Sequence, residues 1–313
     1  MTTTAEALAH GWTLHQAGDL VGAEQVYRET LETDPGNATA WCYLGTTCYD
    51  QDRLEEAVAA YRKAIQILPN FPVALNNLGN TLRLLGRIED SIASFDHALR
   101  LKPDYVNAHK NKGTALIWEG YIEEALASYQ RALDHDPDDA ETHKNLGVVL
   151  LLLGRFQDGW NEYRWRWKTD DISLPNYSQP RWDGSSLDER TILLSVEQGL
   201  GDTVQFIRYA AVLKEKYDCQ VIVACQKVLL PLFKSCQGID LLTTQNDDPP
   251  TFDVFAPLLD LPELLGHDLD SFPTDTPYLF ADPVLVEQWG QALDAYGGFK
   301  VGIAWQGNSK NPS

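Results

Sequence analysis

The sequence is poor in cysteine and contains no long apolar run. Its five cysteines, an odd number, form no Cys-x-x-Cys pair, which argues against a disulfide framework or a zinc ribbon and predicts reduced, buried thiols. No apolar stretch reaches the ~18 residues that a membrane-spanning helix needs. The opening residues, MTTTAEALAHGW, lack the basic region and the apolar core of a signal peptide. We therefore expect no transmembrane segment and a cytoplasmic location.

Basic residues are scarce as well. The chain has 25 Lys and Arg against 45 Asp and Glu, and its formal net charge is -20. That charge opposes binding to nucleic acid and to anionic membranes, so neither is an expected partner. At 313 residues, 44% of them apolar, the chain is instead long and apolar enough for two globular domains.

The first half contains a repeat of 34 residues. Four residue classes recur with that step, namely a glycine, a small residue, an aromatic residue and a proline. The glycines are Gly11, Gly45, Gly79, Gly113 and Gly147, and the small residues are Ala23, Ala57, Ser91, Ala125 and Gly159. The aromatic residues are Tyr27, Tyr61, Phe95, Tyr129 and Tyr163, and the prolines are Pro35, Pro69, Pro103 and Pro137. Chance does not keep four registers over several copies, so residues 4–169 consist of copies of one structural unit.

Each residue class suits a pair of antiparallel helices. The glycine and the small residue let the two helices approach closely, and we expect the aromatic residue to fill the gap between one pair and the next. The proline follows the second helix, which it ends because it has no N–H. This pattern is identified as the tetratricopeptide repeat, whose helix pairs stack into a superhelix with a concave groove. The expected repeats are 4–37, 38–71, 72–105, 106–139 and 140–169.

Asparagine recurs at the groove position two residues before the glycine. Asn77, Asn111 and Asn145 would form a row of amides along the groove floor. An amide both donates and accepts, so such a row can bind the backbone of an extended peptide whatever its side chains. The repeats resemble those of the protein O-GlcNAc transferases, and the resemblance implies this use. Alternatively, the amides satisfy helix ends or contact solvent. Ala9 and Tyr43 interrupt the row in the first two repeats.

Two histidines, His109 and His143, also share a repeat position. They could ligate one metal ion only if neighbouring repeats brought them together, but packed helices lie roughly 10 Å apart. That separation is too large without further ligands. We therefore predict no metal site and no cofactor.

A tryptophan-rich segment joins the two halves. Trp160, Trp165, Trp167 and Trp182 are too many large rings to leave in water, so we expect them to cap the repeats and to attach them to the next domain. A platform on which sugar rings stack is the alternative. Residues 170–190 are expected to form this linker or cap.

From Thr191 the repeat disappears, and short apolar strands alternate with helices. The expected strands are 192–196, 219–225, 239–242 and 252–257, and a helix is expected at 283–296. This alternation predicts a parallel, doubly wound sheet over residues 191–298. Ligands of such sheets lie beyond the carboxyl ends of the strands, where the turn Gly199-Leu200-Gly201-Asp202 follows the first strand.

That turn does not match a dinucleotide-binding motif. Val204 stands where Gly-x-Gly-x-x-Gly requires its third glycine, and no acidic residue follows at the end of the next strand. What remains is the N-terminus of a helix with an acid at its start. Asp202 could be the N-cap of that helix, which would not exclude a catalytic role.

The second half resembles a known transferase family. The stretches WDGSSLDERTILLSVEQGLGDTVQFIRYA, FDVFAPLLDLPELL, TPYLFADP and KVGIAWQGN follow in this order. They are similar to bacterial repeat proteins with a C-terminal family 9 glycosyltransferase domain, the ADP-heptose:lipopolysaccharide heptosyltransferase type. The resemblance implies an inverting, metal-independent enzyme of the GT-B class with two Rossmann-like domains. Asp202 then matches the catalytic base and Glu197 is the second candidate. Gly199, Gly201 and Thr203 belong to the loop that receives the acceptor or a phosphate.

The resemblance also implies a second domain that binds a nucleotide sugar. Residues 299–313 resemble only its first strand, with Asn308, Ser309 and Lys310 as the start of the donor loop. We expect a nucleotide sugar to bind only with a complete second domain, and no transfer by this chain alone. The alternative is a non-catalytic scaffold that binds peptides and carries a degenerate transferase remnant. The expected fold is an α-solenoid of five repeats followed by a Rossmann-like α/β domain, the N-terminal half of GT-B.

Overall fold

The chain folds into two compact units, residues 1–173 and 174–313. The computed structural model describes residues 3–170, 172–197, 199–268, 270–294 and 296–298. The strand expected after residue 299 and the donor-loop residues Asn308, Ser309 and Lys310 lie outside the described residues.

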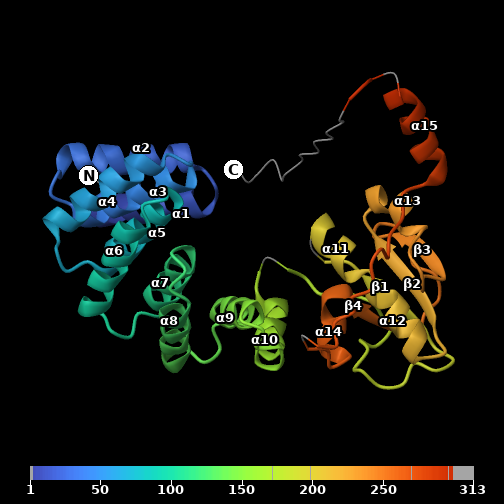
Figure 1. Cartoon of the computed structure of the whole chain (residues 1–313). Coiled ribbons are helices and arrows are strands. Elements are labelled where there is room, and N and C mark those ends of the chain that lie inside the picture. The colour runs from blue at the N-terminus through green and yellow to red at the C-terminus, as the bar shows by residue number, and fades with distance from the viewer. Residues whose placement is uncertain (1–2, 171, 198, 269, 295, 299–313) are drawn as a thin grey trace. The chain divides into compact units, whose positions relative to one another are not determined.

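The first unit is built of paired helices. Its helices are α1 (Thr4–Gln16), α2 (Leu20–Thr33), α3 (Ala38–Asp50), α4 (Leu54–Ile67), α5 (Pro72–Leu84), α6 (Ile88–Leu101), α7 (Val106–Trp118), α8 (Ile122–His135), α9 (Ala140–Leu152) and α10 (Phe156–Tyr163). Successive pairs pack side by side in chain order (Figure 1). The five pairs begin at Thr4, Ala38, Pro72, Val106 and Ala140, which confirms the predicted repeat starts.

In the first four repeats the aromatic residue packs against the glycine. A Cβ atom added to Gly79 would lie 2.6 Å from Cε1 of Phe95, a side chain that is 0% exposed. The same contact recurs between Gly11 and Tyr27 and in the second and fourth repeats. The aromatic ring thus closes the gap between the two helices of one repeat, and only a residue without a side chain leaves it room. The predicted contact with the next repeat is also present in the first repeat, where the ring centroids of Tyr27 and Tyr43 lie 5.5 Å apart.

The last repeat is closed differently. A Cβ on Gly147 would lie 2.5 Å from the backbone nitrogen of Tyr163, so the two helices approach backbone to backbone. A short 3-10 helix, η1 (Arg164–Lys168), follows directly. In it the guanidinium of Arg166 is buried over the rings of Tyr163 and Trp167, at 4.6 and 4.3 Å from their centroids. Aromatic residues thus end the first unit, as predicted.

The second unit contains a parallel sheet. Its strands are β1 (Thr191–Ser195), β2 (Gln220–Cys225), β3 (Leu241–Thr244) and β4 (Val254–Pro257). Their order in the sheet is β3-β2-β1-β4, and each neighbouring pair is parallel (Figure 1). The helical elements of this unit are α11 (Leu200–Phe206), α12 (Tyr209–Lys216), η2 (Lys227–Leu229), α13 (Leu230–Phe233), η3 (Leu258–Asp260), α14 (Leu261–Leu264) and α15 (Pro283–Asp294). The parallel sheet expected from the alternating pattern is confirmed for these four strands.

Most of the predicted linker, residues 174–190, is part of this second unit. The backbone N–H of Trp182 donates to the carbonyl of Phe255 at 2.7 Å, and the indole is 2% exposed. Tyr177 packs edge-on against Phe252 and Phe255, on the face of the sheet that carries Leu193. Trp182 therefore belongs to the core of the second unit, whereas the cap of the repeats uses Trp160, Trp165 and Trp167. Of the four tryptophans expected to cap the repeats and to attach them to the next domain, Trp182 lies in that domain and not in the cap.

The cysteines are buried and unpaired in both units. Cys42 and Cys48 lie in the helical core, and Cys219, Cys225 and Cys236 lie in the second unit. Burial raises the pKa of the Cys42 thiol to about 12, so it stays protonated at neutral pH. The prediction that the cysteines are buried is thus confirmed. Among the described residues no helix is both long and apolar enough to cross a bilayer.

Candidate functional site

The predicted asparagine row lies on three first helices of the solenoid. Asn77 is on α5, Asn111 on α7 and Asn145 on α9, and all three side chains are half-buried. Nδ2 of Asn111 donates to Oδ1 of Asn76 in the preceding repeat at 3.0 Å, and Nδ2 of Asn76 donates to Oδ1 of Asn77 at 3.3 Å. The amides of two neighbouring repeats therefore form one hydrogen-bonded chain.

Asn76 is the member of this chain that the sequence did not single out. It is 5% exposed and connects Asn77 with Asn111. Its only signal in the sequence is that it precedes a predicted groove residue. Asn145 makes no hydrogen bond to another described residue. The side chains of Asn77 and Asn111 form hydrogen bonds with Asn76. They therefore do not satisfy helix ends, which was the alternative interpretation of the row.

Charged side chains next to the row join neighbouring repeats. Lys110 on α7 pairs with Asp139, the N-cap of α9, with Nζ and Oδ2 3.2 Å apart. Burial raises the pKa of Asp139, but hydrogen bonds from Thr142 and the charge of Lys110 outweigh it and hold that pKa below its usual range. The carboxylate is therefore ionised at neutral pH and fixes the start of α9.

His109 and His143, which share a repeat position, each contact a backbone carbonyl of the preceding turn. Nε2 of His109 lies 2.8 Å from the carbonyl oxygen of Pro103, and Nε2 of His143 lies 2.8 Å from that of Pro137. In an earlier repeat Nε1 of Trp41 donates to the carbonyl of Pro35 at 3.0 Å. Each ring thus ties the start of a repeat to the proline turn before it, and this contact accounts for the shared position without a metal ion.

The glycine turn of the second unit lies at the carboxyl end of the central strand. β1 is flanked by β2 on one side and β4 on the other, and the chain enters β4 only after it has passed through β3. α11 follows β1 and contacts η3, which follows β4. The turn therefore lies where the strand order reverses, the place where open parallel sheets bind their ligands.

Asp202 is the third residue of α11 and not its N-cap. The N-cap is Gly199, with φ -65° and ψ 169°, and no side chain caps the helix. The side chain of Asp202 is half-buried and has no hydrogen-bond or ion-pair partner in the described part of the chain. The interpretation of Asp202 as an N-cap was therefore wrong. Thr203 is buried and its hydroxyl donates to the carbonyl of Gly199 at 3.1 Å, so it holds the turn.

The fold itself does not require either glycine of the turn. Neither Gly199 nor Gly201 has a positive φ, a Cβ on Gly201 would meet nothing within 4 Å, and a Cβ on Gly199 would lie 3.9 Å from Oδ2 of Asp202. At Gly11, Gly45, Gly79 and Gly113 of the solenoid, in contrast, an added Cβ atom would overlap an aromatic ring. Two glycines that packing does not demand leave the backbone of this turn open to an approaching molecule.

Carboxylates dominate the electrostatics of this edge. Glu197 and Asp202 follow β1, and Asp247 follows β3, where it accepts from the hydroxyl of Thr244 at 2.7 Å. Asp260, at the end of η3, is 1% exposed and pairs with Arg181. The hydroxyl of Ser195, the last residue of β1, is buried without a partner among the described residues.

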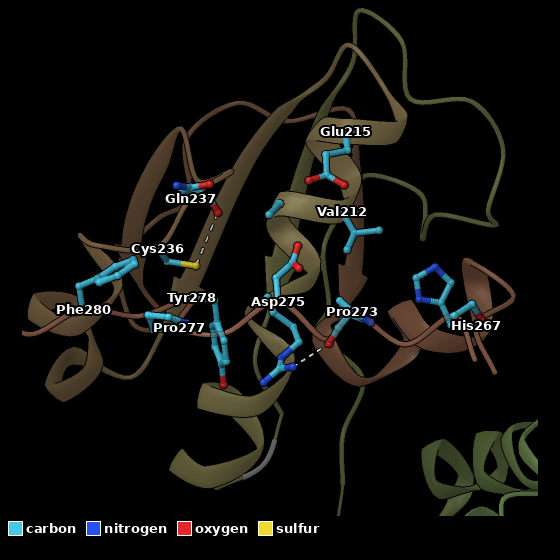
Figure 2. A pocket seen from close by; sticks show the side chains of 13 residues that line it. Val212, Glu215, Cys236, Gln237, His267, Pro273, Asp275, Pro277, Tyr278 and Phe280 are labelled. Carbon is cyan, nitrogen blue, oxygen red and sulfur yellow. Dashed lines mark hydrogen bonds between the residues drawn. The ribbon is translucent and has the colours of Figure 1, made fainter. Parts of the chain in front are cut away.

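A cavity of about 370 Å³ lies along α12, away from the predicted residues. Cys236, Gln237 and Phe280 lie at one end and His267 at the other, with Asp275 and Tyr278 between them (Figure 2). Tyr278 and Phe280 belong to the quoted stretch TPYLFADP, but the sequence analysis assigned no site to them.

The segment 271–280 that covers α12 is fixed by Arg208. Its guanidinium donates to the carbonyl of Pro273 at 2.7 Å and lies 4.0 Å from the centroid of the Tyr278 ring. The hydroxyl of Tyr278 donates to the carbonyl of Val204 on α11 at 3.0 Å. Burial raises the pKa of the Cys236 thiol to about 11 and lowers that of His267. The thiol is therefore protonated and the imidazole neutral at pH 7, so the cavity offers no activated nucleophile.

Comparison with known families identifies the first unit. Models described as tetratricopeptide repeat match residues 14–60 and 72–105, and a model described as TPR repeat matches residues 45–86 and 113–154. Residues 14–154 therefore carry tetratricopeptide repeats, a module that forms extended concave binding surfaces for proteins and peptides.

Similar proteins each match about half of this chain. Protein FlbA of Caulobacter vibrioides is 29% identical over 172 residues, which are 49% of this chain and 29% of FlbA. The chain thus spans less than a third of the length of that relative. Among solved structures, PilW, a type IV pilus biogenesis factor, is 25% identical over 53% of this chain and 78% of its own, with a TM-score of 0.49. YrrB, a TPR protein with an unusual peptide-binding site, is 21% identical over 53% and 86%, with a TM-score of 0.43.

Proposed function

We propose that this chain joins a peptide-binding solenoid to the acceptor-binding half of an inverting glycosyltransferase of the GT-B class. In this proposal residues 174–298 form the Rossmann-like acceptor domain, and the asparagine row receives an extended peptide. The observation that carries the proposal is Asp202, a half-buried carboxylate without a partner among the described residues. It lies on an open glycine turn at the point where the strand order reverses.

Each residue of the turn can have a separate role in an inverting sugar transfer. Asp202 takes the proton of an acceptor hydroxyl while the oxygen forms a bond to the anomeric carbon of the sugar. The bond from that carbon to the diphosphate breaks on the opposite face, and the nucleoside diphosphate leaves with the electron pair. Gly199 and Gly201 let the acceptor approach the backbone, and Thr203 fixes the turn. Glu197 is the second candidate for the base.

A non-catalytic scaffold is the second candidate function. The observation that favours it is that the bonded chain of Asn76, Asn77 and Asn111 lies wholly within the first unit. Peptide binding then needs nothing from residues 174–298. The two candidates share the groove and differ in whether Asp202 matters.

The groove prediction concerns the three predicted asparagines. Asn77, Asn111 and Asn145 changed together to Ala should weaken the binding of extended peptides at least tenfold, about 1.4 kcal/mol, because amide contacts to the peptide backbone are lost. Fluorescence anisotropy with a labelled peptide library measures this change. Asn70 and Asn107, which are exposed and outside the row, changed to Ala form the control and should leave the affinity unchanged. Equal affinities for both variants, with intact folds, would rule out the row.

The donor prediction concerns nucleotide sugars. Titration calorimetry of this chain with ADP- and UDP-sugars should detect no binding, because Glu197, Asp202 and Asp247 repel a diphosphate at the edge of the sheet. Micromolar binding that disappears in Gly201→Val would contradict the assignment of this turn to the acceptor. The turn would then be a nucleotide site.

A further inference from the structure

Exposed apolar residues repeat along the same three helices as the asparagine row. Leu84, Trp118 and Leu152 are the last residues of α5, α7 and α9, and their side chains are 49%, 68% and 71% exposed. Each follows the asparagine of its helix by seven residues. Seven residues are close to two helical turns, so both rows lie on one face, about 10 Å apart along the helix axes. We call Leu84, Trp118 and Leu152 the apolar row.

Three glutamates at the starts of second helices form an acidic row. Glu55, Glu89 and Glu123 are the second residues of α4, α6 and α8, the helices that start directly after the turns at the ends of α3, α5 and α7. All three are exposed, and none has a hydrogen bond or an ion pair within the described ranges. Their neighbours Glu56 and Asp90 are, in contrast, paired with Arg53 and Arg87. Unpaired carboxylates at a repeated position attract cationic groups.

Charge decides between the possible occupants of these rows. A second copy of this chain carries a net charge of -20, and residues 174–313 carry 9 Lys and Arg against 19 Asp and Glu. Neither complements an acidic row. A basic partner does, and the apolar row requires that this partner also present apolar side chains.

The spacing of the repeats selects the conformation of the partner. Helices that pack directly lie roughly 10 Å apart, and the first helices α5 and α7 are in contact. Three residues of a polyproline II helix advance roughly 9 Å and return to the same face, whereas a β-strand turns every other residue away. An apolar side chain at every third position of a polyproline II segment therefore meets successive members of the apolar row.

We propose that the apolar and acidic rows bind a basic, proline-rich segment in polyproline II conformation with an apolar residue at every third position. This inference rests on the proposed peptide-binding function and specifies its partner. The backbone of the segment contacts the asparagine row, its apolar side chains contact Leu84, Trp118 and Leu152, and its Lys or Arg side chains face the glutamates.

The test uses the full chain and a fluorescein-labelled peptide of four Leu-Pro-Lys triplets, with binding measured by fluorescence anisotropy. Leu84→Ser, Trp118→Ser and Leu152→Ser together should weaken binding about thirtyfold, because three apolar contacts are lost. Val21→Ser is the matched control, since Val21 is 74% exposed on α2 outside the row and should not affect binding. Glu55→Gln, Glu89→Gln and Glu123→Gln together should weaken binding about fivefold at low salt and not at high salt.

A second peptide separates this inference from the proposed function. It has the same composition, with the leucines moved out of the three-residue spacing. If both peptides bind equally, and both depend on Asn77, Asn111 and Asn145, the inference is overturned and peptide binding by the solenoid stands. If neither binds, both are overturned. A fall in the urea midpoint of the apolar-row variant, or the loss of a dimer in sedimentation, would show that another part of the chain or a second copy covers the row, and would also overturn the inference.

Discussion

Phe95→Ala should lower the free energy of unfolding of the helical unit by about 4 kcal/mol, a large share of the stability of a domain of this size. The ring is 0% exposed and fills the space over Gly79, so its removal leaves a cavity between α5 and α6. Urea unfolding followed by far-ultraviolet circular dichroism measures the loss. Tyr121→Ala, at a side chain that is 51% exposed, is the control and should cost much less.

A double-mutant cycle tests the pairing of ring and glycine. In the natural chain Gly79→Ala should destabilise by about 1–3 kcal/mol, because the added Cβ overlaps the ring. In the Phe95→Ala background the same change should stabilise by up to about 1 kcal/mol, because alanine is the better helix former and now has room. If Gly79→Ala has the same effect in both backgrounds, the ring does not restrict this position.

Asp202→Asn should lower sugar transfer about 10²–10⁴-fold in a protein that carries this chain together with a donor-binding domain, since that is the usual contribution of a general base. The amide keeps the shape of the side chain but cannot take up the proton of the acceptor. The stability should change little, because the side chain has no partner in the described structure. Initial rates of transfer measured by mass spectrometry, with the urea midpoint recorded in parallel, check both statements.

Two further variants make this result specific. Glu215→Gln, at an exposed carboxylate on α12, should leave the rate unchanged. Glu197→Gln should reduce the rate far less than Asp202→Asn. If Glu197→Gln abolishes transfer while Asp202→Asn does not, Glu197 is the base. If all three variants keep full activity, the carboxylates of this turn take no part in the chemistry.

The repeat architecture followed from the sequence because solenoid contacts are local. Each repeat packs on its neighbours, so the residues that decide the packing recur with the period of the chain. Gly79 and Phe95 could be recognised in this way, and the predicted start of each helix pair was confirmed. The period could not show which helices the ring separates, because an aromatic within a repeat and one between repeats recur with the same step.

The asparagine row also shows what the period of the sequence cannot predict. The period identified Asn77, Asn111 and Asn145, but Asn76 has no counterpart of its own type in other repeats. Its importance comes from a contact across two helices, where Asn111 donates to it. The apolar row follows the period, yet only the exposed surface of Leu84, Trp118 and Leu152 distinguishes it from the many buried leucines of the solenoid.

The second unit depended more on tertiary structure. Alternating apolar strands and helices were sufficient to predict parallel strands, since each element buries a continuous apolar face. The sequence could not reveal that β4 pairs with β1, because strand order is a contact between segments far apart in the chain. It also could not assign Trp182, which looks like one more ring of a tryptophan-rich linker but packs into the sheet domain through Phe255.

By itself, then, the sequence determined the features that recur or alternate along the chain, namely the five helix pairs, the parallel strands and the glycine turn before Asp202. Tertiary structure alone decided which of these features meet. It joined the turn to η3 at the reversal of the strand order, connected Asn111 to Asn76, and left the side chains of the apolar row exposed within their unit. The physical reason is that periodicity reports which face of an element is buried, whereas the partner of that face is chosen by packing between residues that are distant in the sequence.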